Sequence, residues 1–466
     1  MNLENLKLRP YQEEDVEFLK NLDCAGCFNE QRTGKTPTAL MTAEAKGLAD
    51  EKILIITTSS GLYQWADEYK TWLNKPVLIV EGTPNKKKQL IQEWTHGLII
   101  SLGTFKETKN SSGYLDLIIK QKPKMVILDE AHHIRNFKTK AAESVYKLCT
   151  KVPIRLALTG TPAYGKPQDI YSILHFLYPK TYTSPYKFQE EYLKKEIIQV
   201  YDKRYHILRE IKNYTTFLPG KERMLQKQLA TFCTQRKRKE VMKWLPEKDR
   251  QLINLPLTKE QTKYLSELQR VYQTEDLIVK GVLDRLVRYR QICVDPMLLN
   301  LKSKSPKTEW ILNFIEENPD TPLIIFSNFT QYLLKLFDTL EQHKIKEAMI
   351  IGEVPAAKRR QFQNDFQSGK FNVFLINTAS GKEALTLDRA EAIIFADLYP
   401  PIGSIEQAED RFVSTSEDKA DKPHTIYYLM MQNSFEENIW KLLQERKSET
   451  EVINCFQQQL AERSNK

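Results

Sequence analysis

Residues 29–36, NEQRTGKT, end like a loop that binds phosphate. A glycine followed by lysine and a hydroxyl residue brings backbone N–H groups, an ammonium and a metal-binding oxygen to phosphate. Here these are Gly34, Lys35 and Thr36, and Pro37 suits the first turn of a following helix. The usual pattern has a further glycine where this chain has Asn29. Alone, the tripeptide is better explained as chance or an ordinary turn, so other motifs must decide.

Two adjacent carboxylates, Asp129 and Glu130, follow the apolar run MVIL. Ligands of open α/β sheets bind at the carboxyl ends of strands, where this pair is expected to lie. Asp129 can hold Mg²⁺ together with the Thr36 hydroxyl, and Glu130 can orient or deprotonate an attacking water. The alternative is a helix N-terminus with surface acids. It is disfavoured because residues 34–36 and 129–130 both fall at strand ends of one domain.

Two further segments carry side chains suited to phosphate chemistry. Thr159 and Thr161 end the apolar run 155–161 and can bond to the side chains of residues 129–132, although a plain turn is the alternative. Arg411, in the segment 407–411, can reach a γ-phosphate across a cleft as an arginine finger. A solvated arginine on a helix is the alternative for that residue.

Short apolar runs between polar turns predict the elements that position these residues. Continuous apolar runs of this length are typical of strands that are buried on both faces, as in parallel sheets. Helix-like segments, such as 62–73 and 356–368, lie between them, so we expect an α/β fold of doubly wound parallel sheets. The predicted strands lie within residues 52–58, 125–131, 155–161, 322–328, 372–378, 391–397 and 425–430.

The apolar runs form two groups, before residue 162 and after residue 320. Between them, residues 186–212 and 221–244 are charged and helical in period. We therefore expect two α/β lobes with helical protrusions between them, followed by a C-terminal helical extension. The predicted regions are 1–180, 181–302, 303–433 and 434–466.

The composition says less about the function than the motifs do. The net charge is 69 − 60 = +9, which hints at a polyanionic partner but equally suits a solvated basic surface. No run of 18 apolar residues occurs and the N-terminus lacks a signal peptide, so we expect no membrane contact and a cytoplasmic location. Six scattered cysteines suit a reducing compartment. Cys24 and Cys27 form a C-x-x-C pair without a second pair, which favours buried packing over a metal or redox site.

Together, these motifs resemble those of superfamily-two DEAH-box motors, and within that class the Swi/Snf family of ATP-driven double-stranded-DNA translocases. The resemblance covers about residues 6–446 and implies two RecA-like lobes. Segments outside the general helicase motifs make it specific. The matching segments are LRPYQ (8–12), NEQRTGKT (29–36), 53–72, DEAHHIRN (129–136), 156–179, RKRKEVMKWLPEK (236–248), YRQICVDPMLL (289–299), 323–336, NTASGKEALTL (377–387) and 407–411.

The resemblance implies roles for individual residues. Glu130 and Arg411 are the implied catalytic residues, and Gln12 is expected to contact adenine. ATP and Mg²⁺ are the implied ligands, with the metal on Thr36 and Asp129. The residues implied in ATP binding are Gln12, Arg32, Thr33, Gly34, Lys35, Thr36, Asp129 and Gly381. Those implied in coupling are His132, Thr159, Thr161 and Gln407.

The chain departs from the family pattern at two positions. Arg32 stands where the family commonly has glycine, and Ser414 stands where a second motif-VI arginine is usual. Because an arginine finger contributes roughly 10³-fold or more to the rate, the loss at Ser414 matters. Either Arg411 serves alone, or another basic residue such as Arg32 compensates.

Duplex DNA is the implied partner, held through its phosphates rather than its bases. The candidate contacts are Thr58, Ser59, Trp65, Thr104, Ser327, Thr378 and Lys382. The basic run Arg236-Lys237-Arg238-Lys239 can add charge to such a surface, or form a solvated helix face.

The expected function is ATP-driven movement along duplex DNA in replication, recombination or repair. One alternative is a true strand-separating helicase that acts on forks or RNA, and forked or single-stranded DNA is the alternative partner to the duplex. Another is an ATP-dependent DNA clamp with weak hydrolysis. The resemblance leaves almost nothing before residue 6 or after residue 446, so we expect a bare motor of bacterial or bacteriophage type.

Overall fold

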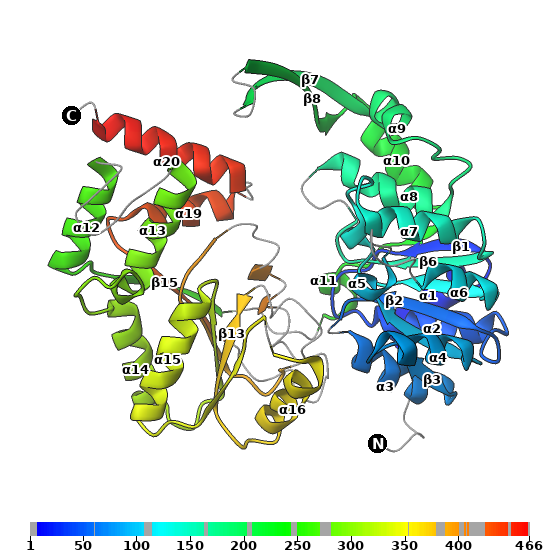
Figure 1. Ribbon diagram of the computed structural model, residues 1–466, viewed down its shortest axis with the longest axis horizontal. Helices are drawn as coiled ribbons and strands as arrows, with labels where there is room; N and C mark the ends of the chain where they lie inside the picture. Colours follow the sequence, from blue (N-terminus) through cyan, green and yellow to red (C-terminus); the bar gives the residue numbers. More distant parts are fainter. Residues whose placement is uncertain are drawn as a thin grey trace. The chain divides into compact units, whose positions relative to one another are not determined.

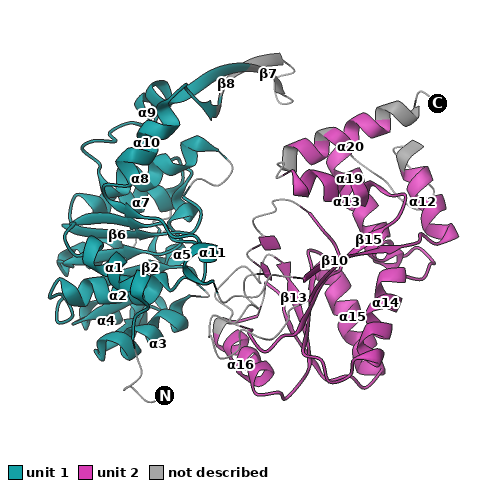
Figure 2. Ribbon diagram, turned by 180° about the vertical axis from the view of Figure 1, so that it is seen from behind, with its two compact units in different colours: residues 1–243 teal, residues 244–466 magenta. Residues whose placement is uncertain are grey.

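The computed structural model of the chain forms two compact units, residues 1–243 and 244–466 (Figure 2). Each unit is built on its own sheet, and each is described separately below. The structure describes residues 7–59, 61–106, 114–162, 166–202, 207–243, 249–270, 281–352, 354–378, 387–399, 405–406, 408–409, 425–445 and 449–464.

The first unit contains a sheet of seven strands, and every neighbouring pair runs parallel. The central strands are almost entirely apolar and buried, as continuous apolar runs predict. In spatial order the strands are β3 (Val77–Ile79), β4 (Gly97–Ser101), β2 (Ile53–Thr57), β5 (Met125–Leu128), β6 (Ile154–Leu158), β1 (Cys24–Cys27) and β9 (Cys233–Thr234).

Helices cover both faces of this sheet (Figure 1). Alternate residues of β2 enter two separate cores, with Ile53 and Ile55 on one face and Leu54 and Ile56 on the other. One core includes side chains of α1 (Pro10–Leu19), α2 (Lys35–Ala45) and α3 (Leu62–Leu73). The other includes side chains of α4 (Pro84–Gln92), α5 (Leu102–Phe105), α6 (Leu115–Lys120), α7 (Lys140–Cys149) and α8 (Tyr171–Leu177), and 3₁₀ helices lie at Ala131–Ile134 and Pro167–Ile170.

The predicted helix over residues 186–212 is wrong. Helix α9 (Pro185–Tyr192) ends early, and β7 (Leu193–Asp202) and β8 (Ile207–Phe217) follow as an antiparallel hairpin that extends away from the main sheet (Figure 1). Isoleucine, valine and tyrosine at 197–201 favour strand over helix, and they outweighed the helical spacing of the charges. The segment 221–244 is also broken, into α10 (Lys221–Leu229), β9 and α11 (Arg238–Val241).

The second unit contains a six-stranded sheet, again parallel throughout. In spatial order the strands are β10 (Asp249–Leu255), β15 (Thr425–Met431), β14 (Ala392–Phe395), β11 (Leu323–Ser327), β13 (Val373–Asn377) and β12 (Glu347–Ile350). The described helices are α12 (Lys259–Arg270), α13 (Val282–Val294), α14 (Pro306–Glu317), α15 (Thr330–Gln342), α16 (Ala356–Gln367), α19 (Phe435–Gln444) and α20 (Glu449–Ser464), with a 3₁₀ helix at Pro296–Leu299.

The predicted fold class, two doubly wound parallel-sheet lobes, is confirmed. The predicted C-terminal helices are present as α19 and α20, and residues of both enter the core of the second unit. Strand β10 was not predicted, and it pairs with β15 at an edge of the second sheet. The structure thus distributes the intermediate region 181–302 between the two units.

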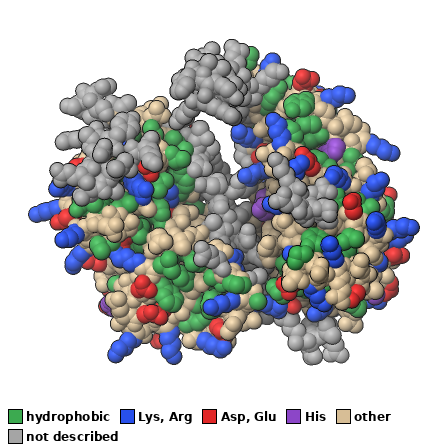
Figure 3. All heavy atoms as spheres, viewed as in Figure 1, with side chains coloured by type: hydrophobic (Ala, Val, Ile, Leu, Met, Phe, Trp, Pro, Cys, Tyr) green, Lys and Arg blue, Asp and Glu red, His purple; other side chains and the backbone are tan. Residues whose placement is uncertain are grey.

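Cys24 and Cys27 are buried in β1, as predicted. They enter different cores, on opposite faces of the sheet, so the two thiols do not converge on a common ligand. None of the described helices is both long and apolar enough to cross a membrane. On the face shown in Figure 3, lysine and arginine side chains are spread among acidic and apolar ones rather than gathered in one patch.

Candidate active site

The predicted phosphate loop connects β1 to α2 in the first unit. Gly34 immediately precedes α2 with φ 77°, and Arg32 also has a positive φ of 62°. Glycine adopts this left-handed conformation freely, whereas other residues pay for it. The family's usual glycine at the position of Arg32 therefore has a conformational reason, and arginine adopts the same backbone here at a cost.

Lys35 closes the loop on itself. Its Nζ donates to the carbonyl oxygens of Asn29 and Glu30, both at 3.0 Å. The Thr33 hydroxyl donates to the same Glu30 carbonyl at 2.8 Å. These two bonds hold the ammonium inside the loop. Phosphate oxygens of a bound nucleotide would compete with the two carbonyls for it.

Gln12 is buried against the loop. Its Nε2 donates to the carbonyl of Thr33 at 3.0 Å, and its Oε1 accepts from the backbone N–H of Arg9 at 2.8 Å. The neighbouring Tyr11 hydroxyl donates to the same Thr33 carbonyl at 2.9 Å. Gln12 thus supports the loop backbone, and its contact with adenine stays a prediction.

Gly34→Ala is expected to weaken ATP binding by roughly tenfold or more, because a Cβ at Gly34 would lie 2.0 Å from Gln12 Nε2. The Gln12 side chain is held at both ends, so moving it breaks its hydrogen bonds to the backbone of Arg9 and Thr33. Gly220→Ala is a matched control: its φ is 76° and a Cβ there meets no atom within 4 Å. Titration with a fluorescent ATP analogue checks the difference. Equal affinity in the two variants would show that the Gln12 contact is irrelevant.

Asn29 replaces the first glycine of the usual pattern for a structural reason. Its side chain is fully buried, and its Nδ2 donates to Asp15 Oδ2 of α1 at 2.7 Å. A glycine would leave this carboxylate oxygen without that donor. The residue that looked anomalous in the sequence therefore fixes the loop to α1.

Asp129 follows β5, next to the end of β2. Its Oδ2 accepts from Thr57 Oγ1 and Trp65 Nε1, both at 2.8 Å. Burial, and then the charge of Glu130, raise the pKa of Asp129, while these two donors and the Lys35 ammonium oppose that rise. The phosphate loop and Asp129 are thus close enough for their charges to interact.

Trp65, one of the predicted DNA contacts, is only 2% exposed, and its indole N–H donates to Asp129. Its contact with DNA stays a prediction. In this structure the residue orients the carboxylate of the candidate site. The spacing of residues 53–72 gave no signal for this contact, which joins elements far apart in sequence.

The residues around Asp129 suit Mg²⁺. Both hydrogen bonds described for Asp129 go to Oδ2, which leaves Oδ1 as the oxygen that can face a cation. The Thr36 hydroxyl, at the start of α2, is a second hard oxygen ligand. The described residues contain no group of three or more His, Cys, Asp or Glu side chains that could hold a metal alone.

Glu130 has a left-handed backbone, φ 45° and ψ 50°, where it precedes the 3₁₀ helix Ala131–Ile134. Such conformations are costly in non-glycine residues and concentrate at functional sites. Its Oε2 lies 3.3 Å from His132 Nδ1, which is also 3.2 Å from Thr159 Oγ1. Burial, together with the charges of His133 and Arg135, lowers the pKa of His132 to about 3, so the ring is neutral at pH 7.

The predicted coupling residues of the first unit therefore meet in space. The Thr159 hydroxyl, which contacts His132, also accepts from the backbone N–H of Thr161 at 3.1 Å. Gly160 adds a contact that was not predicted: a Cβ there would lie 3.2 Å from the backbone nitrogen of Gln31. The 159–161 turn thus touches both the acidic motif and the phosphate loop.

Three predicted DNA contacts lie at the carboxyl ends of β2 and β4, at the same sheet edge as Asp129. Ser59 is exposed, while Thr58 and Thr104 are half-buried. The Thr58 hydroxyl accepts from Gly61 N at 3.3 Å, and that of Thr104 accepts from Ser101 Oγ at 3.0 Å. Of the three, Ser59 is the most accessible donor.

In the second unit, Ser327 is fully buried and donates to Asp397, and its contact with DNA stays a prediction. Asp397 was not predicted, and it also accepts from the Asn328 backbone at 2.9 Å and from Arg290 at 2.9 Å. Thr378 is 4% exposed. The predicted residues Gly381, Lys382, Gln407 and Arg411, and the position of Ser414, lie outside the described residues.

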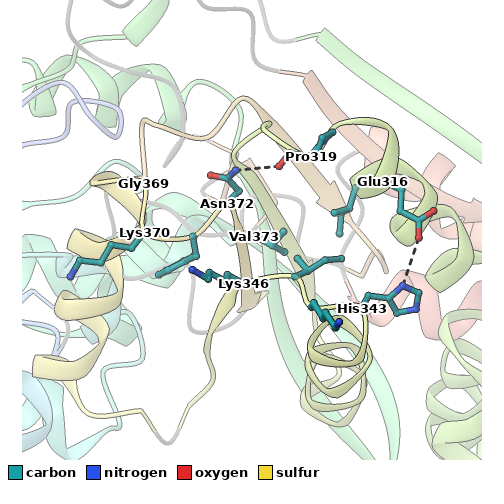
Figure 4. Close-up of a pocket in the computed structure, with 12 residues that line it drawn as sticks. Glu316, Pro319, His343, Lys346, Gly369, Lys370, Asn372 and Val373 are labelled. Carbon is teal, nitrogen blue, oxygen red and sulfur yellow. Dashed lines mark hydrogen bonds and ion pairs between the residues drawn. The ribbon is translucent and has the colours of Figure 1, made fainter.

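A hollow of about 380 Å³ in the second unit is separate from these residues (Figure 4). It lies at the amino ends of β12 and β13, whereas Ser327, Thr378 and Asp397 lie at carboxyl ends of the same parallel sheet. Its lining includes Lys346, Lys370, His343 and Glu316. His343 Nδ1 lies 3.7 Å from Glu316 Oε1.

Comparison with known proteins adds to this geometry. Residues 11–298 match the SNF2-related domain, and residues 306–415 match the helicase conserved C-terminal domain. The chain is similar to the DNA annealing helicase and endonuclease ZRANB3 of Mus musculus, with 23% identity over 94% of this chain and 40% of that protein. It is also similar to an uncharacterized ATP-dependent helicase of Mycoplasma pneumoniae, with 24% identity over 98% of this chain and 44% of that protein.

One solved structure is also similar, the Sulfolobus solfataricus SWI2/SNF2 ATPase core in complex with double-stranded DNA. It is 21% identical, has a TM-score of 0.43, and the match covers 94% of this chain and 91% of that one. The chain spans about two fifths of the length of the curated relatives that it matches.

Proposed function

The chain belongs to the SNF2-related domain family, and we propose that it is an ATP-dependent DNA translocase. It would couple ATP hydrolysis to movement along duplex DNA in replication, recombination or repair. The observation that carries this proposal is the network of the first unit, in which Glu130 contacts His132 and the 159–161 turn contacts both His132 and the phosphate loop. The relatives' names as ATP-dependent and DNA annealing helicases support the same class of activity.

In the proposed reaction, Lys35 exchanges its bonds to the Asn29 and Glu30 carbonyls for the β- and γ-phosphates. Thr36 and Asp129 would hold Mg²⁺, which supplies neutralisation of phosphate charge. Glu130 orients the attacking water and accepts its proton as the bond between the γ-phosphorus and the ADP oxygen breaks. Neutral His132 lies between Glu130 and Thr159, with its Nδ1 at 3.3 Å from Glu130 Oε2 and 3.2 Å from Thr159 Oγ1.

In the proposed cycle, the two lobes close around ATP and reopen after hydrolysis, and this change would drive movement along DNA. The strand-end donors Thr58, Ser59 and Thr104 would contact backbone phosphates, with Thr378 and Lys382 as further proposed contacts. Phosphate contacts position the protein without reading sequence, as a motor that tracks DNA requires. Forked DNA and single-stranded DNA are further substrates that we propose for the protein. The free cysteines suit the reducing cytoplasm of a bacterial or phage-infected cell, or a nucleus.

Arg411 is the proposed finger, and Arg32 is the residue we propose to compensate for Ser414. Arg32→Gly is expected to relieve the positive φ at this position and raise stability by about 1 kcal/mol. If Arg32 supplies charge at the phosphates, the ATPase rate falls in the same variant. Thermal unfolding and steady-state ATPase measurements separate the two effects. An unchanged rate in a stabilised variant would show that Arg32 does not compensate.

Translocation and strand separation are distinguished by two substrates. A translocase displaces the third strand of a DNA triplex under ATP without unwinding a forked duplex. A true helicase, the first alternative, unwinds the fork. An ATP-dependent clamp, the second alternative, binds both substrates and processes neither.

A further inference from the structure

A segment late in the first unit runs along β1 and continues beside the phosphate loop. This flanking segment, residues 232–238, contains β9, which pairs parallel with β1. The pairing extends past the strand: Phe28 N donates to Thr234 O, and Glu30 N donates to Arg236 O, both at 2.9 Å. The first two residues of NEQRTGKT therefore lie against a partner some 200 positions later in the chain.

The side chain of Arg236 reaches back toward α1. Its Nε donates to Asp15 Oδ1 at 2.9 Å, and its NH2 nitrogen donates to Glu14 Oε2 at 2.9 Å. Asp15 is fully buried, and its other oxygen accepts from Asn29 Nδ2 at 2.7 Å. One carboxylate thus joins the flanking segment to the phosphate loop, with each oxygen receiving a separate donor.

Glu30 is fixed from the same side. Its backbone N–H bonds to the flanking segment, and its Oε2 accepts from the backbone N–H of Arg238 at 2.8 Å. The carbonyls of Asn29 and Glu30 are the two groups that hold Lys35 Nζ. Arg236 is therefore connected to Lys35 by described hydrogen bonds and by the covalent bonds within Asn29 and Glu30.

We propose that Arg236 is a positioning residue for ATP binding, acting through Asp15 and Asn29 to hold the loop that carries Lys35. Arg236 lies in the segment 236–248 that carries part of the resemblance, but the resemblance assigns it no role; the kinetic part of the proposed role rests on the proposed function. The proposal also gives Arg236, the first residue of the basic run 236–239, a role other than DNA binding. Arg236 is committed to two carboxylates, whereas Lys237 is 74% exposed and lies 4.0 Å from Glu240.

The test uses the full chain and a pair of substitutions that removes the charges of Asp15 and Arg236 together. Arg236→Gln alone leaves the Asp15 carboxylate buried without its cation and can fail to fold. The double variant Asp15→Asn/Arg236→Gln avoids that problem. We expect its Kd for a fluorescent ADP analogue and its KM for ATP to rise about tenfold, with kcat changed by less than about threefold. Amide exchange of residues 28–36 should be faster.

Two comparisons make the result specific. Lys237→Gln, in the same segment, should leave Kd, KM and exchange at wild-type values. In an Asn29→Gly background, which already lacks the link to Asp15, adding the double substitution should raise KM by less than about threefold, because the pathway is broken. Arg236→Lys in the wild-type background should give an intermediate KM, since one ammonium replaces a two-donor fork.

Unchanged exchange and unchanged ADP affinity in the double variant would overturn the proposal. So would a tenfold rise in KM that persists in full in the Asn29→Gly background. A loss of DNA affinity in both the double variant and Lys237→Gln, without any change in KM, would show a DNA-binding strip instead. ADP binding and amide exchange need no hydrolysis. A wild-type chain that binds ADP without turning over ATP would therefore refute the proposed function alone.

Discussion

Lys35→Ala is expected to lower the ATPase rate by at least ~10²-fold while the protein stays folded. The ammonium follows Gly34 at the end of the loop, and its described bonds go to the carbonyls of Asn29 and Glu30. Removing it deprives the transferred phosphate of a charge-assisted donor but opens no cavity in either core. Steady-state ATPase and circular dichroism measure the two effects.

Lys88→Ala is the matched control, because Lys88 is an exposed lysine on α4 of the same unit. Its rate should equal that of the wild-type chain. If the Lys35 variant kept more than about a tenth of the wild-type rate, the loop would not be the phosphate site. DNA binding should persist in the Lys35 variant, since the proposed DNA contacts lie on other loops.

Glu130→Gln should still bind ATP and DNA but lose turnover by roughly 10³-fold. Glutamine keeps the size of the side chain and bears the left-handed backbone at the same cost, so the local fold is retained. It cannot accept the proton of the attacking water. Glu143→Gln is the control for loss of a carboxylate, because Glu143 is an exposed residue of α7.

Single-turnover hydrolysis with radiolabelled ATP distinguishes the loss of chemistry from slow product release in the Glu130 variant. Nucleotide affinity within about threefold of the wild-type value is expected. Retained turnover in this variant would remove Glu130 from its assigned role.

The sequence was sufficient to predict the strands that are buried on both faces. Runs such as 52–58 and 372–378 became β2 and β13, because a parallel sheet covered by helices needs continuous apolar strands. The hairpin of β7 and β8 was missed because its charged residues are spaced like those of a helix. Strand β10 was missed because, of its residues, only Leu255 is fully buried.

The phosphate and acidic motifs were predictable because their chemistry requires particular residue types at fixed spacing. The contacts that support them were not. Trp65 with Asp129, and Arg236 with Asp15, join residues 64 and 221 positions apart, and no local spacing encodes such pairs. Asn29 is the clearest example. The sequence shows only that it replaces a glycine, whereas the structure shows that its side chain donates to Asp15.

The most direct test of the central claim is the ATPase rate measured with duplex DNA, single-stranded DNA, forked DNA, RNA and no nucleic acid. If ATP hydrolysis drives movement along duplex DNA, duplex should raise the rate by about tenfold or more over the protein alone, and RNA should not. The Lys35→Ala protein should show no stimulation with any of them. A wild-type rate that is the same with and without every nucleic acid would contradict the account.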